Sequence, residues 1–360
     1  MNVAFFLGAL NRGGAETLLA DIFERGEKLP FRAVCIYRNE GNMSSVFHAT
    51  SVPMLQLERK GSWLQYGVRF RRLVKKEKIQ IVHAQSAFNA AIAILCLALT
   101  KVKIVTTLHG TGFSNANILY KWLVFRHSTR MVCVSEWERS YYHNFNTLGA
   151  HERFVVIPNG IDFNKFGYLL SRPRKDGPIR MCMVGNFVTE KDQYFICHFL
   201  KELSERDVPF EFYFVGREVP AYKKCFNDCV TFCENNGLSD RVHFTGVRND
   251  IPQLLCQMDA FIYASKSETF GLAPVEAIAV GLPTFLNDLD VFVEIAKDGQ
   301  YAILYKSGDV QDLYSKFQDF SRNRQSYYDR AMVNASAIRN IYSISTHING
   351  LFSLYSQIMS

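Results

Sequence analysis

Short apolar runs alternate with helix-like segments along this chain, and the alternation occurs in two successive blocks. The first block predicts strands over residues 3–7, 33–37, 79–83, 102–108, 131–134 and 154–157. The second predicts strands over residues 179–184, 210–215, 242–245, 260–263 and 284–286. Strands that alternate with helices are typical of βαβ units and parallel sheets. We therefore predict an α/β fold with two Rossmann-like domains that face each other across a cleft.

A polar stretch rich in Pro and Gly, residues 171–178, separates the two blocks and is the best candidate for a linker. The 360 residues are also too many for one ordinary hydrophobic core. We predict an N-terminal domain over residues 1–168 and a C-terminal domain over residues 169–338. Residues 339–360 are predicted to be a C-terminal helix that can pack back on the N-terminal domain.

Composition places the chain in the globular class, with 48% apolar and 21% charged residues. Its apolar N-terminus is short and is interpreted as a buried strand, and residues 90–100 are too few to cross a bilayer. Nine scattered cysteines indicate reduced thiols. Cys225, Cys229 and Cys233 share a helix face, but a metal site would need a fourth ligand. We expect no metal and a cytoplasmic location, either free or peripheral on the inner face of the plasma membrane.

The net charge of +7 comes from the first half of the chain, which is rich in Lys and Arg. Residues 69–78 hold much of this excess. They form either an ordinary solvated helix face or a surface for an anionic partner, such as a membrane or a phosphate group. The motifs of nucleic-acid-binding domains are absent from the sequence, so we expect no nucleic-acid partner.

Glycine-rich loops follow the first strand of each block. Gly13 and Gly14 precede the first helix, and residues 185–191, which include Asn186 and end at Lys191, occupy the same place in the second block. Such loops let backbone N–H groups approach an anion, although a tight turn needs glycine as well. Lys191 could neutralise a phosphate. The loops do not follow the GxGxxG pattern of nicotinamide-dependent dehydrogenases.

His109 follows the predicted strand 102–108 and precedes Gly110, so it is expected at the ligand-binding edge of a sheet. A histidine there could position or transfer a proton, and its alternative is a structural histidine. His83 ends its own predicted strand. A purely structural role is a stronger possibility for His83 than for His109.

Two glutamates, Glu268 and Glu276, lie in a largely apolar stretch. Gly271 and Pro274 predict a helix over residues 274–280, with Glu268 in the preceding loop and Glu276 in the first turn. The amides that precede this helix can face an anion. Two carboxylates around such a loop would accept hydrogen bonds from hydroxyl groups, so the ligand should carry both phosphate and sugar.

The spacing Glu268-x7-Glu276, extended to Pro283, resembles the motif of the GT-B-fold retaining glycosyltransferases of family 4. The resemblance covers nearly the whole chain. Within the family, the chain looks most like the exopolysaccharide and capsule branch. Supporting motifs are residues 11–16, 109–110, 132–135, 157–162 and 244–246.

This resemblance implies a catalytic group of three residues and a donor-binding group around them. His109 would lie over the donor sugar, Lys191 would bind the diphosphate, and Glu268 would contact sugar hydroxyls. Glu276 would accept from the ribose. The remaining donor contacts would come from the diphosphate-binding Gly14 and Asn186, from Gly246, Val247 and Arg248 beside the base, and from the amides of Phe270, Gly271 and Leu272.

The implied activity is transfer of a hexose or N-acetylhexosamine from a nucleotide diphosphate sugar, with a UDP-sugar favoured. The acceptor would be a glycan or a lipid-linked glycan in cell-surface polysaccharide synthesis, and no cofactor is expected. The alternatives are a nucleotide-sugar epimerase or hydrolase on the same fold, and a weakly active nucleotide-sugar-binding assembly partner.

Two residues depart from the family pattern. Asn186 stands where the family usually has Arg, which removes a bidentate phosphate ligand. Asp290 stands where a glycine is common in the loop after Pro283, which faces the donor sugar. These positions bear on activity and on the identity of the sugar.

Overall fold

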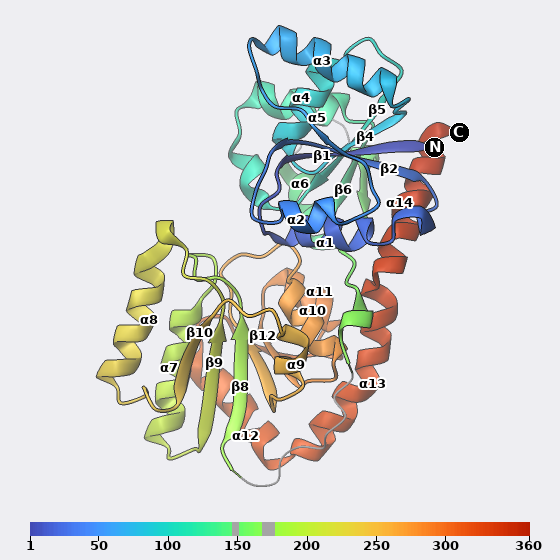
Figure 1. The fold of residues 1–360 in the computed structure, drawn as a ribbon. Helices are drawn as coiled ribbons and strands as arrows, with labels where there is room; N and C mark the ends of the chain where they lie inside the picture. The colour runs from blue at the N-terminus through green and yellow to red at the C-terminus, as the bar shows by residue number, and fades with distance from the viewer. Residues whose placement is uncertain (146–150, 168–176) are drawn as a thin grey trace. The chain divides into compact units, whose positions relative to one another are not determined.

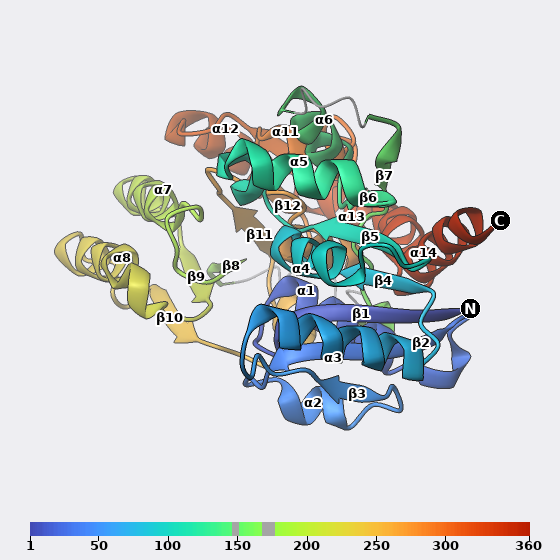
Figure 2. The same ribbon diagram turned by 90° about the horizontal axis from the view of Figure 1, so that it is seen from above.

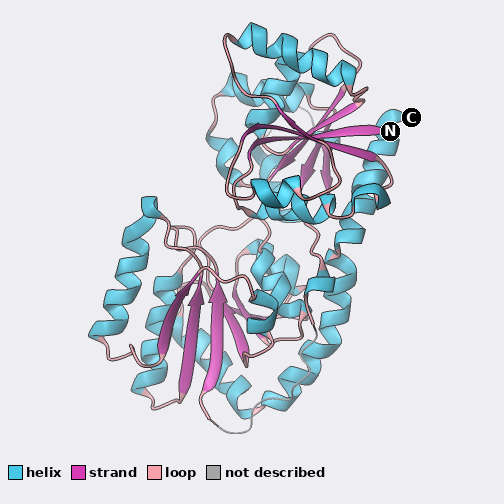
Figure 3. Cartoon of the chain, viewed as in Figure 1, coloured by secondary structure: helices cyan, strands magenta, loops and turns pink. Residues whose placement is uncertain are grey.

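The structure is a computed structural model, and it describes residues 1–145, 151–167 and 177–360. These residues form two compact units, Met1–Ile161 with Ile344–Ser360 and Asp162–Ser343. The predicted linker and the predicted boundary at residues 168 and 169 fall on or beside residues 168–176, which lie outside the described residues. Each unit contains one sheet with helices around it (Figures 1 and 3).

The first unit has a seven-stranded parallel sheet in the order β3-β2-β1-β4-β5-β6-β7. Its strands are β1 (Asn2–Ala9), β2 (Arg32–Asn39), β3 (Met54–Gln56), β4 (Ile81–Ala84), β5 (Lys103–Leu108), β6 (Arg130–Cys133) and β7 (Phe154–Val156). Its α-helices are α1 (Gly14–Phe23), α2 (Ser44–His48), α3 (Trp63–Lys76), α4 (Ala87–Leu97), α5 (Ile118–His127), α6 (Glu136–Phe145) and α14 (Ile344–Met359).

The second unit has a six-stranded parallel sheet in the order β10-β9-β8-β11-β12-β13. Its strands are β8 (Ile179–Val184), β9 (Phe210–Val215), β10 (Val242–Gly246), β11 (Ala260–Tyr263), β12 (Thr284–Asn287) and β13 (Ile303–Tyr305). Its α-helices are α7 (Gln193–Glu205), α8 (Lys223–Asn235), α9 (Ile251–Leu255), α10 (Leu272–Ala279), α11 (Asp290–Ala296), α12 (Val310–Arg322) and α13 (Arg324–Tyr342).

Burial on both faces explains why the strands are continuous apolar runs. In β1, Val3, Phe5 and Leu7 belong to one core cluster, whereas Ala4 and Phe6 belong to the cluster on the opposite face. Side chains alternate between the two faces of a strand, so a strand covered on both sides must be apolar at every position. The prediction of two Rossmann-like α/β units is confirmed by the two parallel sheets.

The strand order in each sheet reverses at one point, between β1 and β4 in the first unit and between β8 and β11 in the second. In open α/β sheets, ligands bind outside the carboxyl ends of the strands at such a reversal. This topology places the loops after β8 and β11 together, and the predicted Lys191 and Glu268 lie in those loops.

The C-terminal segment departs from the prediction of one helix. The break falls at Ser343, whose backbone is extended, and separates α13 from α14. The amide of Ile344 donates to the carbonyl of Ile161 at 2.9 Å and not to a carbonyl of the preceding helical turn. The series of hydrogen bonds within α13 therefore ends here. Helix α14 then packs within the first unit, where the ring of Tyr355 meets that of Phe31 at 5.3 Å.

Candidate functional site

The loop after β8 is joined to the loop after β11 in the second unit. Lys191 and Ser265 form an isolated antiparallel bridge. The Ser265 hydroxyl donates to the carbonyl of Glu190 at 2.7 Å, and the amide of Lys266 donates to the same carbonyl at 2.8 Å. The two loops therefore form one structure at the point where the strand order reverses.

Lys191 and Glu268 form an ion pair in this structure, and each side chain is 17% exposed. The Lys191 ammonium also lies 5.2 Å from the centre of the Tyr263 ring. The Tyr263 hydroxyl donates to Glu268 Oε2 at 3.3 Å. A cation, a carboxylate and a phenol thus meet at the carboxyl ends of β8 and β11.

The protonation states of this cluster follow from its surroundings. Burial by itself lowers the pKa of Lys191, but the interactions with Tyr263 and Glu268 outweigh burial, so the pKa of Lys191 lies above its usual value. Burial raises the pKa of Tyr263 above its usual range. At neutral pH, Lys191 is therefore a fixed positive charge and Tyr263 a neutral hydrogen-bond donor.

Asn287, at the end of β12, holds the loop that carries Glu268, and sequence reasoning missed it. The Asn287 side chain accepts from the amide of Ser265 at 3.0 Å and donates to its carbonyl at 2.8 Å. It also donates to the Ser307 hydroxyl at 2.9 Å. A buried asparagine directly after an apolar strand was the available signal, because a buried amide needs hydrogen-bond partners.

Three glycines line the same edge of the sheet, at the ends of β8, β9 and β10. The predicted Gly246 ends β10, and Gly185 follows β8. Gly216, which was not predicted, follows β9 with φ of 156°, and a Cβ there would overlap the carbonyl oxygen of Gly185. Its amide donates to the carbonyl of Gly246 at 2.9 Å. Because glycine has no side chain, a ligand can come close to the backbone along this row.

The polar residues beside this row are already paired with protein groups. Asn186 Oδ1 accepts from the amide of Arg217 at 3.0 Å. The Arg248 guanidinium binds both carboxylate oxygens of Asp250, at 2.9 and 2.5 Å. Val247 is exposed beside Arg248. Asn186 thus holds the turn after β9 in place. Arg248 would have to release Asp250 before it could bind a ligand.

Helix α10 begins at Leu272, two residues before the predicted start at Pro274. Proline fits in the first turn because the N–H groups there have no partner within the helix. Glu276 is therefore in the second turn, and the prediction of the first turn is wrong. Gly271 caps the helix with φ of 90°, which favours glycine, and Phe270 is buried with its ring 5.4 Å from that of Tyr342.

The structure also places Asp290 differently from the prediction. It is the first residue of α11 and not a loop residue. A carboxylate in the first turn complements the positive end of the helix dipole, which is a structural role. Glu294 lies one turn later in the same helix.

In the first unit, His109 directly follows β5, as predicted. Its Nε2 lies 3.1 Å from Gln85 Oε1, so the Gln85 side chain orients the imidazole ring. Burial lowers the pKa of His109 to about 4, with a smaller contribution from His347 in the same direction. His109 is therefore a neutral imidazole at pH 7.

The first unit also contains the predicted Gly14 and a buried glutamate near the loop that carries His109. Gly14 is the first residue of α1, the helix that follows β1. Glu138, which sequence reasoning missed, is buried in α6 and accepts from the amide of Val134 at 2.8 Å. Burial raises the pKa of Glu138 to about 8. Tyr142, one turn later, donates to the carbonyl of Gly110 and so supports the loop that carries His109.

Structural roles account for His83 and for the cysteines. His83 lies 2.5 Å from the Tyr355 hydroxyl and 2.6 Å from that of Thr107, so it is a satisfied core histidine. Cys233 is 3.9 Å from Cys197, sulfur to sulfur, in the interface of α7 and α8. Within residues 1–145, 151–167 and 177–360, no group of three or more His, Cys, Asp or Glu side chains could hold a metal.

The two halves of the chain match two family models. Residues 12–165 match Glycosyltransferase Family 4, and residues 171–337 match Glycosyl transferases group 1. Together the two matches cover most of the chain, and they meet close to the division between the two units.

Curated relatives include two bacterial enzymes. The chain is 27% identical over 243 residues to the UDP-Gal:alpha-D-GlcNAc-diphosphoundecaprenol alpha-1,3-galactosyltransferase of Escherichia coli, covering 61% of this chain and 60% of that enzyme. That alignment therefore spans less than two thirds of the relative. The chain is also 26% identical over 303 residues to the N-acetyl-alpha-D-glucosaminyl L-malate synthase of Bacillus anthracis, covering 78% and 74% of the two chains.

Among solved structures, HepE of Anabaena in complex with UDP superposes with a TM-score of 0.87 at 18% identity, covering 99% of this chain and 100% of HepE. This likeness establishes the fold. The sheets, the two family matches and the relatives agree that this chain belongs to the group 1 and family 4 glycosyltransferases and is a transferase of the GT-B fold.

Proposed function

We propose that the chain transfers a hexose or N-acetylhexosamine from a nucleotide diphosphate sugar to a glycan or lipid-linked acceptor in cell-surface polysaccharide synthesis. The observation that carries this proposal is the pairing of Lys191 with Glu268 where the strand order of the second unit reverses. A permanently charged ammonium and a carboxylate side by side suit a ligand that carries a diphosphate next to sugar hydroxyls.

The donor would be held by the groups around this pair. Lys191 and the N–H groups of Phe270, Gly271 and Leu272, at the start of α10, would bind the diphosphate. The row of glycines ending at Gly246 leaves room for the nucleotide to approach the backbone. Glu276 would accept from the ribose and Glu268 from the donor sugar. These groups supply the positive charge that a divalent metal would otherwise supply, so we propose a metal-independent reaction without a cofactor.

The transfer step would retain the configuration at the anomeric carbon. The bond from this carbon to the diphosphate oxygen breaks, and a bond to the acceptor hydroxyl oxygen forms on the same face. The acceptor proton leaves on the departing diphosphate. Lys191 would stabilise the charge that develops on the leaving group, the kind of preorganised electrostatic effect that dominates many enzymes. His109, neutral and held by Gln85, would contact the donor sugar.

The names of similar proteins support a nucleotide diphosphate sugar, which is a UDP-sugar in two of the three below, and a lipid-linked acceptor. The Escherichia coli enzyme is named for UDP-Gal and a diphosphoundecaprenol acceptor. A GDP-mannose:cellobiosyl-diphosphopolyprenol alpha-mannosyltransferase of Xanthomonas oryzae is 25% identical over 188 residues. HepE was solved with UDP-glucose as well as with UDP. A protein that uses such acceptors would work at the cytoplasmic membrane surface.

The decisive experiment is a screen of nucleotide sugars with the purified protein, with and without a polyprenyl-diphosphate-linked acceptor. Transfer should require the acceptor, and the product's anomeric configuration should equal the donor's in the NMR spectrum. Donor conversion without acceptor would instead show an epimerase or hydrolase. Nucleotide binding without turnover would show a binding partner, and Asn186→Arg would then test whether the missing guanidinium is the reason. A folded protein that binds no nucleotide sugar would overturn the proposal.

A further inference from the structure

Helices α3, α4 and α5 of the first unit pack next to one another and enclose an apolar groove of about 690 Å³. Figure 2 shows the three helices from above. Most of the lining is apolar, and its principal members are Trp63, Leu64, Val68, Phe88, Leu95 and Leu119. These six residues are called the groove surface below.

The groove surface brings several exposed apolar side chains together in one place. Leu64 is 80% exposed, Leu119 is 76% and Leu95 is 63%. Isolated exposed apolar residues are normal in folded proteins, but a contiguous apolar patch marks a site of interaction. The side chains come from three helices and share one groove, so they form such a patch.

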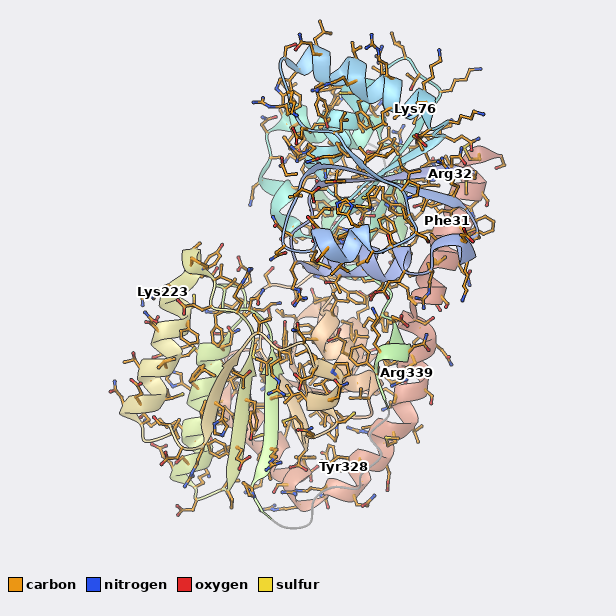
Figure 4. All side chains as sticks on the ribbon, viewed as in Figure 1. Phe31, Arg32, Lys76, Lys223, Tyr328 and Arg339 are labelled. Carbon is orange, nitrogen blue, oxygen red and sulfur yellow. The ribbon has the colours of Figure 1, made fainter. Side chains whose placement is uncertain are left out.

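The charges on the same helices have a single sign. Helices α3 and α5 carry seven Lys and Arg residues, α4 carries no charged residue, and none of the three contains Asp or Glu. Arg71 is used within the fold, since its Nη2 donates to the carbonyl of Ala98 at 2.9 Å. Arg72, Lys75 and Lys76 are exposed, and Figure 4 shows Lys76 on the outside of α3. An ordinary solvated surface would mix both signs.

Two exposed tryptophans belong to the helices that form the groove. The chain has three tryptophans, and two of them are about half exposed: Trp63, which lines the groove, and Trp122 on α5, one turn beyond Leu119. The Arg59 guanidinium lies 5.2 Å from the centre of the Trp63 ring. Tryptophan is enriched at the boundary between water and a bilayer, because its large ring is apolar and its N–H is polar.

These features favour one partner over the others. A second copy of the chain on a two-fold axis would bring the same cations face to face, which is repulsive. A nucleic acid would match the charge but has no use for an apolar groove. An anionic bilayer offers both acyl chains for the groove and phosphates for the basic residues. We propose that the groove surface docks the protein on an anionic lipid bilayer.

The position of the groove surface gives this docking a purpose. Helices α3, α4 and α5 follow β3, β4 and β5, so their first turns lie toward the carboxyl edge of the sheet, where His109 follows β5. Within the described residues no helix is long and apolar enough to span a membrane, so contact would be peripheral. This benefit rests on the proposed function, because a lipid-linked acceptor would lie in the same bilayer.

The test is flotation of the full-length protein with phosphatidylcholine vesicles, with and without phosphatidylglycerol, in the absence of any sugar nucleotide. The protein should float only with the anionic vesicles, and tryptophan fluorescence should shift to the blue. The double variant Leu64→Glu, Leu119→Glu should abolish both signals. The matched control is Val333→Glu on α13, whose side chain is 76% exposed, and this variant should bind like the parent.

The basic residues are tested separately. Arg72→Gln, Lys75→Gln and Lys76→Gln should each weaken vesicle binding about fivefold, and added salt should do the same. Lys223→Gln on α8, labelled in Figure 4, is the control for loss of a surface charge and should change nothing.

Three outcomes would overturn the proposal: no binding of the parent protein, equal binding of the Leu64→Glu, Leu119→Glu variant, or a parent dimer that this variant converts to a monomer. The last would assign the groove surface to a second copy. Lys191→Ala distinguishes this proposal from the enzymatic one, because it should lose transfer and keep vesicle binding. A protein that floats but transfers no sugar would refute the proposed function alone.

Discussion

Lys191 and Glu268 form an ion pair although they are 77 residues apart in the chain. They follow β8 and β11, which are neighbours in the second sheet. Because both side chains are largely buried, loss of one would leave the other as an uncompensated charge. The pair therefore prepares a fixed ammonium at the edge where a diphosphate would bind.

Replacing Lys191 by Met should lower kcat/KM by about 10²–10³-fold, as loss of a preorganised charge in an active site does. It should also lower the stability, since Glu268 then lacks its partner. The double variant Lys191→Met, Glu268→Gln should recover stability without activity, which chemical denaturation and rate measurements would establish. Lys224→Met is the control, because Lys224 pairs with Asp228 on the exposed surface of α8. Full activity of Lys191→Met would refute the role in diphosphate binding.

Asn287→Leu should lower the free energy of unfolding by about 1–3 kcal/mol, because the amide and carbonyl of Ser265 lose their buried partner. The same change should lower kcat, since the loop after β11 carries Glu268. Urea denaturation and initial rates measure the two effects. Asn235→Leu on the exposed face of α8 should leave both unchanged. If Asn287→Leu lost stability but kept its kcat, Asn287 would be a structural residue only.

Gly216→Ala should abolish nucleotide binding or prevent folding, because the new Cβ would overlap the Gly185 carbonyl oxygen at the site itself. Gly237→Ala is the matched control. Gly237 also has positive φ, but no atom lies within 4 Å of its Cβ position, so only the backbone strain of about 1 kcal/mol remains. Thermal unfolding with and without UDP compares the two variants. Equal behaviour of the two alanines would contradict the close approach at Gly216.

Acid should destabilise the protein through its buried histidines. Burial lowers the pKa of His83 to about 3, and it lowers the pKa of His109 and of His347 to about 4. Below the ordinary histidine pKa of 6.5, the unfolded chain binds protons that the folded chain does not, so stability falls as pH falls from about 6.5 toward 4. Glu138, whose pKa burial raises to about 8, acts in the opposite direction over part of this range.

Thermal unfolding between about pH 7 and about pH 5 measures this balance, and three histidines should outweigh one glutamate. His83→Asn should flatten the pH dependence, whereas His127→Asn at an exposed position should not. A melting temperature that stays constant or rises on acidification would contradict the assignment of these histidines as buried and neutral.

Local pattern was enough to predict the strands and the character of the loops. Val3 to Leu7 had to form a strand covered on both faces, because five successive apolar residues fit nothing else as well. Lys191 and Glu268 stood out because charges in an apolar context need partners. The family matches agree with the fold that these patterns predicted.

The start of α10 and the break at Ser343 were set by contacts that local pattern does not contain. Pro274 indicated a helix start, yet the helix is capped by Gly271 and begins at Leu272, two residues before Pro274. Ser343 interrupts a helical pattern because the amide of Ile344 finds the carbonyl of Ile161, far away in the chain. Propensity is a weak preference, and one tertiary hydrogen bond can override it.

The sequence by itself determined the βαβ succession, the two units and the residue types available at the strand ends, because these depend on periodicity and steric preference within a few residues. Only the tertiary structure decided that β11 lies beside β8, that Asn287 holds Ser265, and that apolar side chains of three helices share one groove. Strand order and helix packing depend on which surfaces bury each other, and side chains distant in the chain meet only once that burial is complete.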